Sequence, residues 1–391
     1  MKISILNAGQ QTDYLYGIVS GLSEIPSLEI EVVDSISSIG VVDTLQHTAL
    51  FNLRGDNLSP QSPVVKAYRI FTYYIRLLWY TAHTSSKLFH IQWENSISLV
   101  DRTILVLYYK LFGKKLVYTA HNIDKDARDG RTTFLRRSSL EVMYHLMDGV
   151  IVHTQKMKDE LCQLFHVSPE KVVVIPHGIN NRIPRRGLTQ QEARKMLGIE
   201  STAHTILFFG QIDEYKGVEI LIEAASLLVK ENPEVVLMIV GKPKRQHTYA
   251  AALKSQAAKM LPEKNVLFRM QFIPADEVET FFAAADCLVL PYKCIYQSGV
   301  IFLSYRFGLP IIATDVGSFR EDVLDGVTGF ICQPDDVKDM AEKLRIFFGS
   351  TLFHQHEQTH ADIIDRAEKK YSWSNIGRQT VDLYSRVLKH S

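Results

Sequence analysis

The chain of 391 residues lacks the features that mark several classes of protein. No uninterrupted apolar run approaches the ~20 residues of a membrane-spanning helix. Its formal net charge of +1 gives no overall field that would attract nucleic acid or a membrane. Cysteine is scarce and shows no metal-ligand spacing, so we expect buried free thiols in a reducing compartment. The four cysteines are Cys162, Cys287, Cys294 and Cys332.

Carboxylates are missing from one stretch where they would matter. No Asp or Glu occurs from Cys287 to Thr314, yet this stretch contains the turn "YQSGV" followed by a helical pattern. The N-terminus "MKISILNAG" has one positive charge and a short alternating run, which indicates a first strand and not a signal peptide.

Short, mostly β-branched apolar runs recur along the chain and are separated by amphipathic segments of helical length. Runs that are apolar on both faces are typical of buried parallel strands with helical crossovers. Six lie in each half: "ISILNAG", "LEIEVVD", "LFHIQW", "KLVYTAH", "GVIVHT" and "VVVIPHG", then "TILFFG", "VVLMIVG", "VLFRMQF", "CLVLPY", "PIIATDV" and "GFICQP". The length also exceeds that of one hydrophobic core. The sequence therefore predicts an α/β protein of two doubly wound, Rossmann-like domains.

The domain boundaries follow from composition. We predict a first domain at residues 1–182, a polar linker at 183–204, a second domain at 205–373 and a C-terminal helix at 374–391. The linker region contains Pro184, Gly187 and few apolar residues. The apolar residues of the last segment recur at helical spacing, so this helix packs on another part of the protein.

Candidate binding residues in the first half lie where strands end, because ligands of open α/β sheets bind outside the carboxyl ends of the strands. Gly9 follows the first strand in a turn of small residues that could receive a phosphate. His121 follows the strand "KLVYTA", and His177 with Gly178 follows "VVVIP". A structural histidine and a simple linker turn remain the alternatives at these places.

The second half has more specific candidates. Gly210 and Gln211 end a strand, and Lys216 opens a helix, where a cation opposes the helix dipole unless an anion binds there. In "QSGV", Ser298 to Val300 present consecutive backbone N–H groups, Gly299 permits close approach, and Gln297 offers donor and acceptor atoms. A solvated surface lysine and a helix that only packs are the alternatives.

Together these residues resemble family 4 of the retaining nucleotide-sugar glycosyltransferases, which have the GT-B fold. The resemblance extends over almost the whole chain, through "TAHN", "DGVIVHTQKMKDEL", "VVVIPHGI", "FFGQIDEYKG", "AADCLVLPY", "GLPIIATDVGSFREDV", "DGVTGF" and the final "YSW" helix. It implies that the second domain binds the donor and the first domain the acceptor, with the C-terminal helix crossing back to pack on the first domain.

The resemblance also implies roles for single residues. Gly9 matches the loop near the donor phosphates, His121 the histidine beside the donor sugar, and Lys216 the lysine that contacts the diphosphate. Phe272 and Ile273 lie where the backbone of family members meets the base. The sequence departs from the family at two places, because Gln211 replaces an arginine, and Ile295 and Leu303 replace two glutamates. A branch of the family has "QSGV" in place of the glutamate motif.

We therefore expect a retaining glycosyltransferase that needs neither metal nor cofactor and takes a nucleotide sugar as substrate. In such a transfer the donor phosphate accepts the proton of the acceptor, so no enzymic base is required. The Asp-x-Asp pattern at Asp124 to Asp126, which could in principle bind a metal, lies in a polar loop and is interpreted as a loop or acceptor-site element. The alternatives are an inactive nucleotide-binding subunit that supports a partner transferase, and a sugar-nucleotide epimerase of the same fold.

The stretch from Val64 to Arg137 has thirteen Lys and Arg against five Asp and Glu, a surplus of eight in a chain of net charge +1. Its segment "VVKAYRIFTYYIRLLWYTAHTSSK" is either a core helix with a basic edge or an amphipathic face for anionic lipid. We expect a glycan or lipid-linked acceptor, no nucleic acid, and a cytoplasmic location with peripheral contact at the inner face of the membrane as an open alternative.

Overall fold

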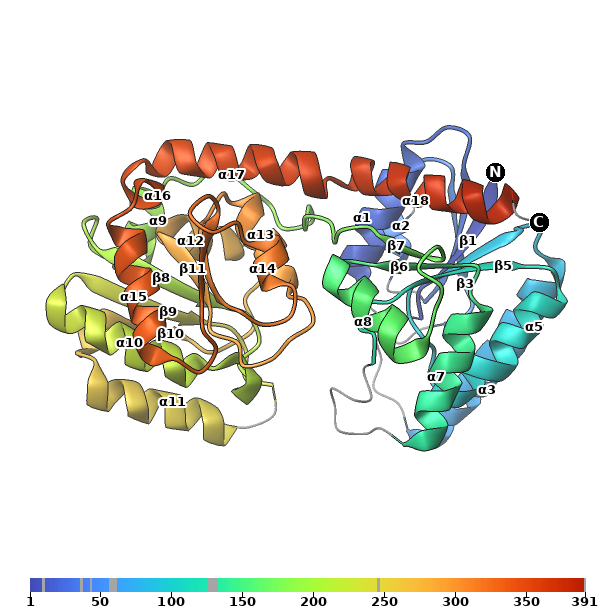
Figure 1. Cartoon of the computed structure of the whole chain (residues 1–391), viewed down its shortest axis with the longest axis horizontal. Helices are drawn as coiled ribbons and strands as arrows, with labels where there is room; N and C mark the ends of the chain where they lie inside the picture. Colours follow the sequence, from blue (N-terminus) through green and yellow to red (C-terminus); the bar gives the residue numbers. More distant parts are fainter. Residues whose placement is uncertain are drawn as a thin grey trace. The chain divides into compact units, whose positions relative to one another are not determined.

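Two parallel β-sheets, each flanked by helices, organise the protein (Figure 1). The computed structural model describes residues 1–8, 11–35, 38–42, 44–55, 62–124, 133–244 and 247–389. The chain divides into two compact units. The first combines Met1–Gly178 with Tyr371–Ser391, and the second is Ile179–Lys370.

The described strands of the first unit form a seven-stranded parallel sheet in the order β3-β2-β1-β4-β5-β6-β7. The strands are β1 (Lys2–Leu6), β2 (Glu29–Asp34), β3 (Thr48–Asn52), β4 (Leu88–Ile91), β5 (Lys115–Thr119), β6 (Gly149–Val152) and β7 (Val172–Val174). The helices are α1 (Thr12–Ser23), α2 (Ile39–Val42), α3 (Pro63–His83), α4 (Ser98–Val100), the π-helical turn η2 (Asp101–Leu105), α5 (Val106–Leu111), α7 (Phe134–Leu146), α8 (Gln155–Phe165) and α18 (Trp373–Lys389).

The second unit has a six-stranded parallel sheet in the order β10-β9-β8-β11-β12-β13 within the described residues. Its strands are β8 (His204–Phe209), β9 (Val235–Val240), β10 (Val266–Arg269), β11 (Cys287–Leu290), β12 (Ile311–Thr314) and β13 (Gly329–Cys332). Its helices are α9 (Gln190–Leu197), α10 (Val218–Glu231), α11 (His247–Met260), α12 (Val278–Ala284), α13 (Gly299–Arg306), α14 (Phe319–Asp322), α15 (Val337–Phe348), α16 (Thr351–His354) and α17 (His356–Tyr371), with 3₁₀ turns η3 (Glu214–Lys216) and η4 (Glu263–Asn265).

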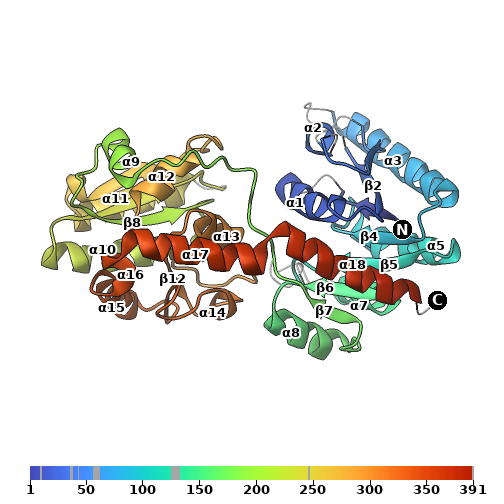
Figure 2. The ribbon, with the colours of Figure 1, turned by 90° about the horizontal axis from the view of Figure 1, so that it is seen from above.

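The C-terminal helix α18 belongs to the first unit, where it lies beside α1 (Figure 2). The Trp373 ring occupies the space that side chains at Gly17 and Gly178 would need, since an added Cβ would lie 2.0 Å and 2.3 Å from its Cε2. Ile376 and Tyr384 are fully buried in the core of this unit. The helix therefore ties the last residues of the chain to its beginning.

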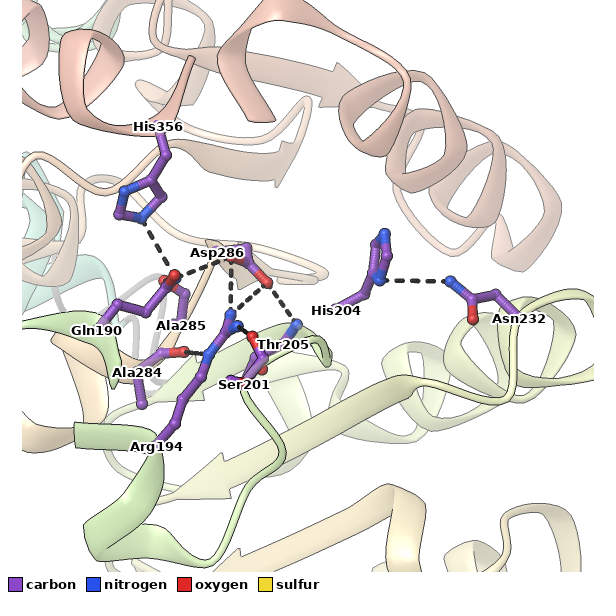
Figure 3. A network of polar contacts seen from close by, with 10 residues as sticks. All are labelled: Gln190, Arg194, Ser201, His204, Thr205, Asn232, Ala284, Ala285, Asp286 and His356. Atoms are coloured by element: carbon purple, nitrogen blue, oxygen red, sulfur yellow. Dashed lines mark hydrogen bonds and ion pairs between the residues drawn. The ribbon is translucent and has the colours of Figure 1, made fainter. Parts of the chain in front are cut away.

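The region expected to be a linker is instead part of the second unit, which begins at Ile179. Thr189 and Glu192 form a capping box that starts α9. Arg194 on this helix is buried and forms a bidentate ion pair with Asp286, at 2.9 Å to each oxygen (Figure 3). Arg194 also donates to the backbone carbonyl of Ala284, 3.0 Å away. One charge of this polar segment is thus paired inside the unit.

Two further expectations need correction. The edge strand β3 was not predicted from the sequence, because its residues are only half-buried or exposed and lack a continuous apolar pattern. Cys287 and Cys332 are buried free thiols as expected, but Cys294 is exposed and Cys162 is half-buried.

No helix in the described ranges is long and apolar enough to cross a membrane.

Candidate functional site

Both sheets have a point where the direction of strand order reverses. It lies between β1 and β4 in the first sheet and between β8 and β11 in the second. Loops that leave neighbouring parallel strands there on opposite sides open a crevice, which is where α/β sheets bind ligands. Gly210, Lys216 and the "QSGV" turn follow β8 and β11 at the second of these points, whereas His121 follows β5, the neighbour of β4 in the first sheet.

In the second unit, Lys216 lies at the end of η3, directly before Gly217 and α10. Its side chain is only 6 % exposed, and its Nζ donates to the hydroxyl of Tyr292 at 2.7 Å. Burial lowers the pKa of Lys216, and no carboxylate of the described residues forms an ion pair with it. A buried cation without a counter-ion is costly to the fold, so this position is suited to an anionic ligand.

Tyr292 connects Lys216 with the "QSGV" turn. Tyr292 follows β11 and is fully buried, and its hydroxyl lies 3.4 Å from that of Ser298. Ser298 is the N-cap of α13 but its side chain makes no capping hydrogen bond. The first N–H groups of an α-helix have no partner within the helix, so the start of α13 offers donors beside the lysine.

Glycine residues limit the number of side chains around Lys216 and the start of α13. Gly210 ends β8 with φ 128°, and a Cβ there would lie 3.4 Å from Lys216 Nζ and 3.6 Å from Val300 Cγ2. Gly217 has φ 61°, and a Cβ there would collide with the carbonyl oxygen of Pro291 at 2.1 Å. Around Gly299 nothing lies within 4 Å of a built Cβ, so open space adjoins the first turn of α13.

A buried carboxyl group lies behind the turn. Asp322 accepts a hydrogen bond of 2.8 Å from the hydroxyl of Ser318, whose backbone N–H donates to the carbonyl of Tyr296. Burial raises the pKa of Asp322 to about 6, against the opposing effect of the Ser318 hydrogen bond. The Gln297 amide lowers that pKa from nearby, yet its buried Nε2 has no hydrogen-bond partner of normal geometry in the described residues.

The remaining candidates of the second unit lie on neighbouring loops. Gln211 is exposed directly after Gly210. Phe272 and Ile273 follow β10; the Phe272 side chain is 73 % exposed, whereas Ile273 is buried. The structure thus brings Gly210, Lys216, Ser298 and Val300 together, and it places Phe272 and Ile273 after a strand two positions away in the sheet.

In the first unit, His121 follows β5 and lies among aromatic rings. Trp93, which follows β4, stacks on it with centroids 4.3 Å apart, and Tyr14 of α1 meets its ring edge-to-face at 4.5 Å. His153, which follows β6, lies next to it, and His177, which follows β7, lies next to His153. Burial, together with these two histidines, lowers the pKa of His121 well below its usual value.

The hydrogen bonds assign the tautomer of His121. His153 Nδ1 lies 3.0 Å from the carbonyl of Ile175, which can only accept, so Nδ1 carries the proton. Burial lowers the pKa of His153 to about 3, so the ring is neutral and its Nε2 accepts from His121 Nδ1 at 3.1 Å. His121 Nε2 then has a free lone pair, and it has no partner in the described part of the chain. It can accept a hydrogen bond from a hydroxyl group.

The other candidates of the first unit are less well defined. Gly9 and Asp126 lie outside the described residues, and the described Asp124 is buried. No group of three or more His, Cys, Asp or Glu suited to a metal ion occurs in the ranges described.

The sequence alone did not single out Tyr292, Trp93, His153 or Asp322. Trp93 Nε1 is buried without a hydrogen-bond partner in the described residues, on the ring that stacks on His121. A Trp two residues beyond a strand was the available signal for it. Nothing in the sequence indicates that Tyr292 joins Lys216 to Ser298, because that contact depends on the paths of two loops.

Comparison with known proteins agrees with this architecture. Residues 57–182 match the family described as Glycosyltransferase Family 4, and residues 189–370 match Glycosyl transferases group 1. The D-inositol 3-phosphate glycosyltransferase of Thermobispora bispora is 26 % identical over 290 residues, which cover 71 % of this chain and 66 % of that protein. An uncharacterised glycosyltransferase of Methanocaldococcus jannaschii is 26 % identical over 61 % of this chain and 60 % of its own length. The matched region thus spans about two thirds or less of these relatives.

Solved structures share the fold over the whole chain. Sucrose-phosphate synthase from Thermosynechococcus elongatus has a TM-score of 0.76 at 16 % identity, with 100 % of both chains covered. Anabaena HepE in complex with UDP has a TM-score of 0.74 at 17 % identity, covering 99 % of this chain and 100 % of that one. Two Rossmann-like units with these neighbours define the GT-B class of protein. The two family matches together cover most of the chain, and the protein belongs to the family 4 glycosyltransferases.

The buried carboxyl of Asp322 leads to a pH prediction. Its pKa is raised in the folded state, so its contribution to stability is present below about pH 4 and is lost as the pH rises through 6. The free energy of unfolding of Asp322→Asn, relative to that of the wild type, should therefore rise by on the order of 2 kcal/mol from pH 4 to pH 7. Urea unfolding of both proteins at the two pH values measures this difference. Asp276→Asn, at an exposed position of the same unit, is the control. If the free energies of unfolding of Asp322→Asn and wild type differed by the same amount at both pH values, Asp322 would ionise in the folded protein without loss of stability.

Proposed function

We propose that the protein transfers a sugar, with retention of anomeric configuration and without a metal, from a nucleotide diphosphate donor to a glycan or lipid-linked acceptor. The observation that carries this proposal is the buried Lys216, which has no ion-pair partner in the described residues and lies at the switch point of the second sheet. Support also comes from HepE, which has been solved with UDP and with UDP-glucose. The second unit is then the donor-binding unit.

The chemistry needs a stabiliser for the charge that develops on the leaving diphosphate. Lys216 can supply one charge, and the N–H groups at Ser298 to Val300 can supply donors that are already oriented. The acceptor proton passes to a phosphate oxygen of the donor, so the reaction needs no basic side chain. His121 accepts a hydrogen bond from a hydroxyl of the sugar at Nε2, and the neighbouring Trp93 Nε1–H can donate to another.

A second candidate function is a nucleotide-binding subunit without activity. Gln211, Ile295 and Leu303 stand where the family has an arginine and two glutamates, and this substitution is the observation in its favour. Incubation with a panel of UDP-, GDP- and ADP-sugars, with and without EDTA, separates the two. Slow release of nucleotide that persists in EDTA supports the transferase, whereas binding without turnover supports the inactive subunit.

Lys216 gives the sharpest test of the donor site. Lys216→Met should weaken nucleotide diphosphate binding by on the order of 2 kcal/mol, the scale of a charge-assisted contact at a shielded site. The same variant should unfold at an equal or higher temperature without ligand, because a buried, unpaired cation has been removed. Calorimetric titration and thermal unfolding measure the two effects. Lys230→Met, exposed at the end of α10, is the matched control and should change neither. Unchanged affinity in Lys216→Met would remove the lysine from the site.

His121 should matter for the sugar and not for the nucleotide. His121→Ala should lower turnover at saturating donor at least tenfold, while the affinity for free nucleotide diphosphate stays within about twofold, because Nε2 contacts the sugar only. Steady-state kinetics and titration with the free nucleotide give both quantities. The exposed His145 of α7 provides the control His145→Ala. Equal losses of turnover and nucleotide affinity would indicate a purely structural histidine.

A further inference from the structure

Helix α3 of the first unit exposes a stripe of large apolar side chains. Tyr68, Phe71, Ile75 and Trp79 are 67 %, 64 %, 50 % and 64 % exposed. Their spacing of three and four residues places them on one side of the helix. The side that faces the sheet is formed by other residues, Tyr73, Leu77 and Tyr80, which are buried. The helix is therefore apolar on two faces, and the expected interpretation as a core helix with a basic edge explains only one of them.

A second stripe continues this surface. Ile104, Leu107 and Leu111, from η2 and α5, are also exposed at a spacing of three and four. The two stripes belong to neighbouring helices, because the Tyr108 hydroxyl of α5 donates to the carbonyl of Leu78 in α3. Helix α7, which packs against η2 and α5, adds Phe134 and Leu135 at its start (Figure 1). We call the exposed side chains of Tyr68, Phe71, Ile75, Trp79, Ile104, Leu107 and Leu111 the apolar face.

Exposed large apolar side chains are more frequent in this region than in the rest of the described protein. Fifteen of the 23 exposed large hydrophobic residues lie between Val64 and Val142, which is about a fifth of the chain. Single exposed apolar side chains are normal, but a gathering of this size marks an interaction surface.

The charges around the apolar face select the kind of partner. Helix α3 carries Lys66, Arg69 and Arg76 and no acidic residue. Arg69 and Arg76 lie along one side of the stripe, where they donate to the backbone carbonyls of Arg54 and Leu53, and both Lys66 and Arg76 are exposed. The nearby acidic groups are occupied within the unit, because Glu94 pairs with Arg102 and Asp101 accepts from Tyr74. An apolar stripe on a helix whose charged residues are all cations is complementary to anionic lipid headgroups over acyl chains.

We propose that the apolar face docks the first unit on an anionic lipid bilayer. The helices lie in the interface, with the aromatic and aliphatic side chains below the headgroups and the basic side chains at their level. This inference deepens the proposed function and rests on it for the lipid-linked acceptor, which the docked unit would meet at the membrane surface.

Tryptophan fluorescence of the protein can report its binding to lipid vesicles. Among its three tryptophans, Trp79 lies on the apolar face, Trp373 is buried, and Trp93 is stacked on His121. Vesicles with 30 % anionic phosphatidylglycerol in phosphatidylcholine should shift the emission of the wild type to shorter wavelength and carry the protein down in sedimentation. Pure phosphatidylcholine vesicles should bind at least tenfold less, and 0.5 M salt should weaken binding to the anionic vesicles.

Variants separate the contributions of the apolar and the basic side chains to vesicle binding. Phe71→Ser with Ile75→Ser, and Lys66→Glu with Arg76→Glu, should each lower vesicle binding at least tenfold, and Trp79→Phe should abolish the emission shift. The matched control, Met196→Ser with Met260→Ser, changes two exposed apolar side chains of the second unit and should bind like the wild type. Nucleotide binding by the apolar-face variants should be unchanged, so a failure of docking is distinguishable from a failure of the proposed function. Equal binding by the Phe71/Ile75 variant, or dimers that form through this face and bind no vesicles, would overturn the proposal.

Discussion

The buried ammonium group of Lys216 is the constraint on which the second unit depends. It is 6 % exposed, donates to Tyr292, and has no ion pair in the described residues. A fold optimised for stability alone would place an apolar side chain there, because removing a charge from water costs several kcal/mol unless an opposite charge compensates it. The cation is retained at a switch point, beside the start of α13, where a diphosphate can supply the missing charge.

The carboxylate that acts electrostatically on this lysine, Asp213, is ion-paired with Lys244, so no described carboxylate pairs with Lys216. A glutamate near Lys216 would pair with the lysine and compete with the phosphates. The carboxyl group that does lie behind the turn, Asp322, is buried, and burial raises its pKa to about 6, so it becomes ionised between pH 4 and pH 7. In the first unit, the neutral candidate for a sugar contact under the proposed function is the Nε2 lone pair of His121, which has no partner in the described residues.

Much of this architecture follows from the sequence, because strands that are buried on both faces leave continuous apolar runs. All twelve runs correspond to strands of the two sheets, Gly210 and His121 lie just after strands, and Lys216 lies just before α10 as its position indicated. The half-exposed β3 has no such run, so it could not be found. The polar residues of α9 were mistaken for a linker because the burial of Arg194 depends on Asp286, which lies 92 residues further along the chain. Tyr292, Trp93 and His153 complete the two candidate sites through contacts between loops, and such contacts leave no periodic signal.

The central claim is that the backbone of "QSGV", together with Lys216, binds the diphosphate. Gly299 tests it most directly, because an added Cβ there meets no protein atom within 4 Å, so a larger side chain can be placed in the open space where the claim puts the diphosphate. Calorimetric titration of Gly299→Leu with nucleotide diphosphate should show a loss of affinity of at least tenfold, with the unfolding temperature unchanged or raised because leucine favours the helix. Gly299→Ala, the smaller change, should lose less. Wild-type affinity in Gly299→Leu would contradict the claim and leave α13 as a helix that only packs.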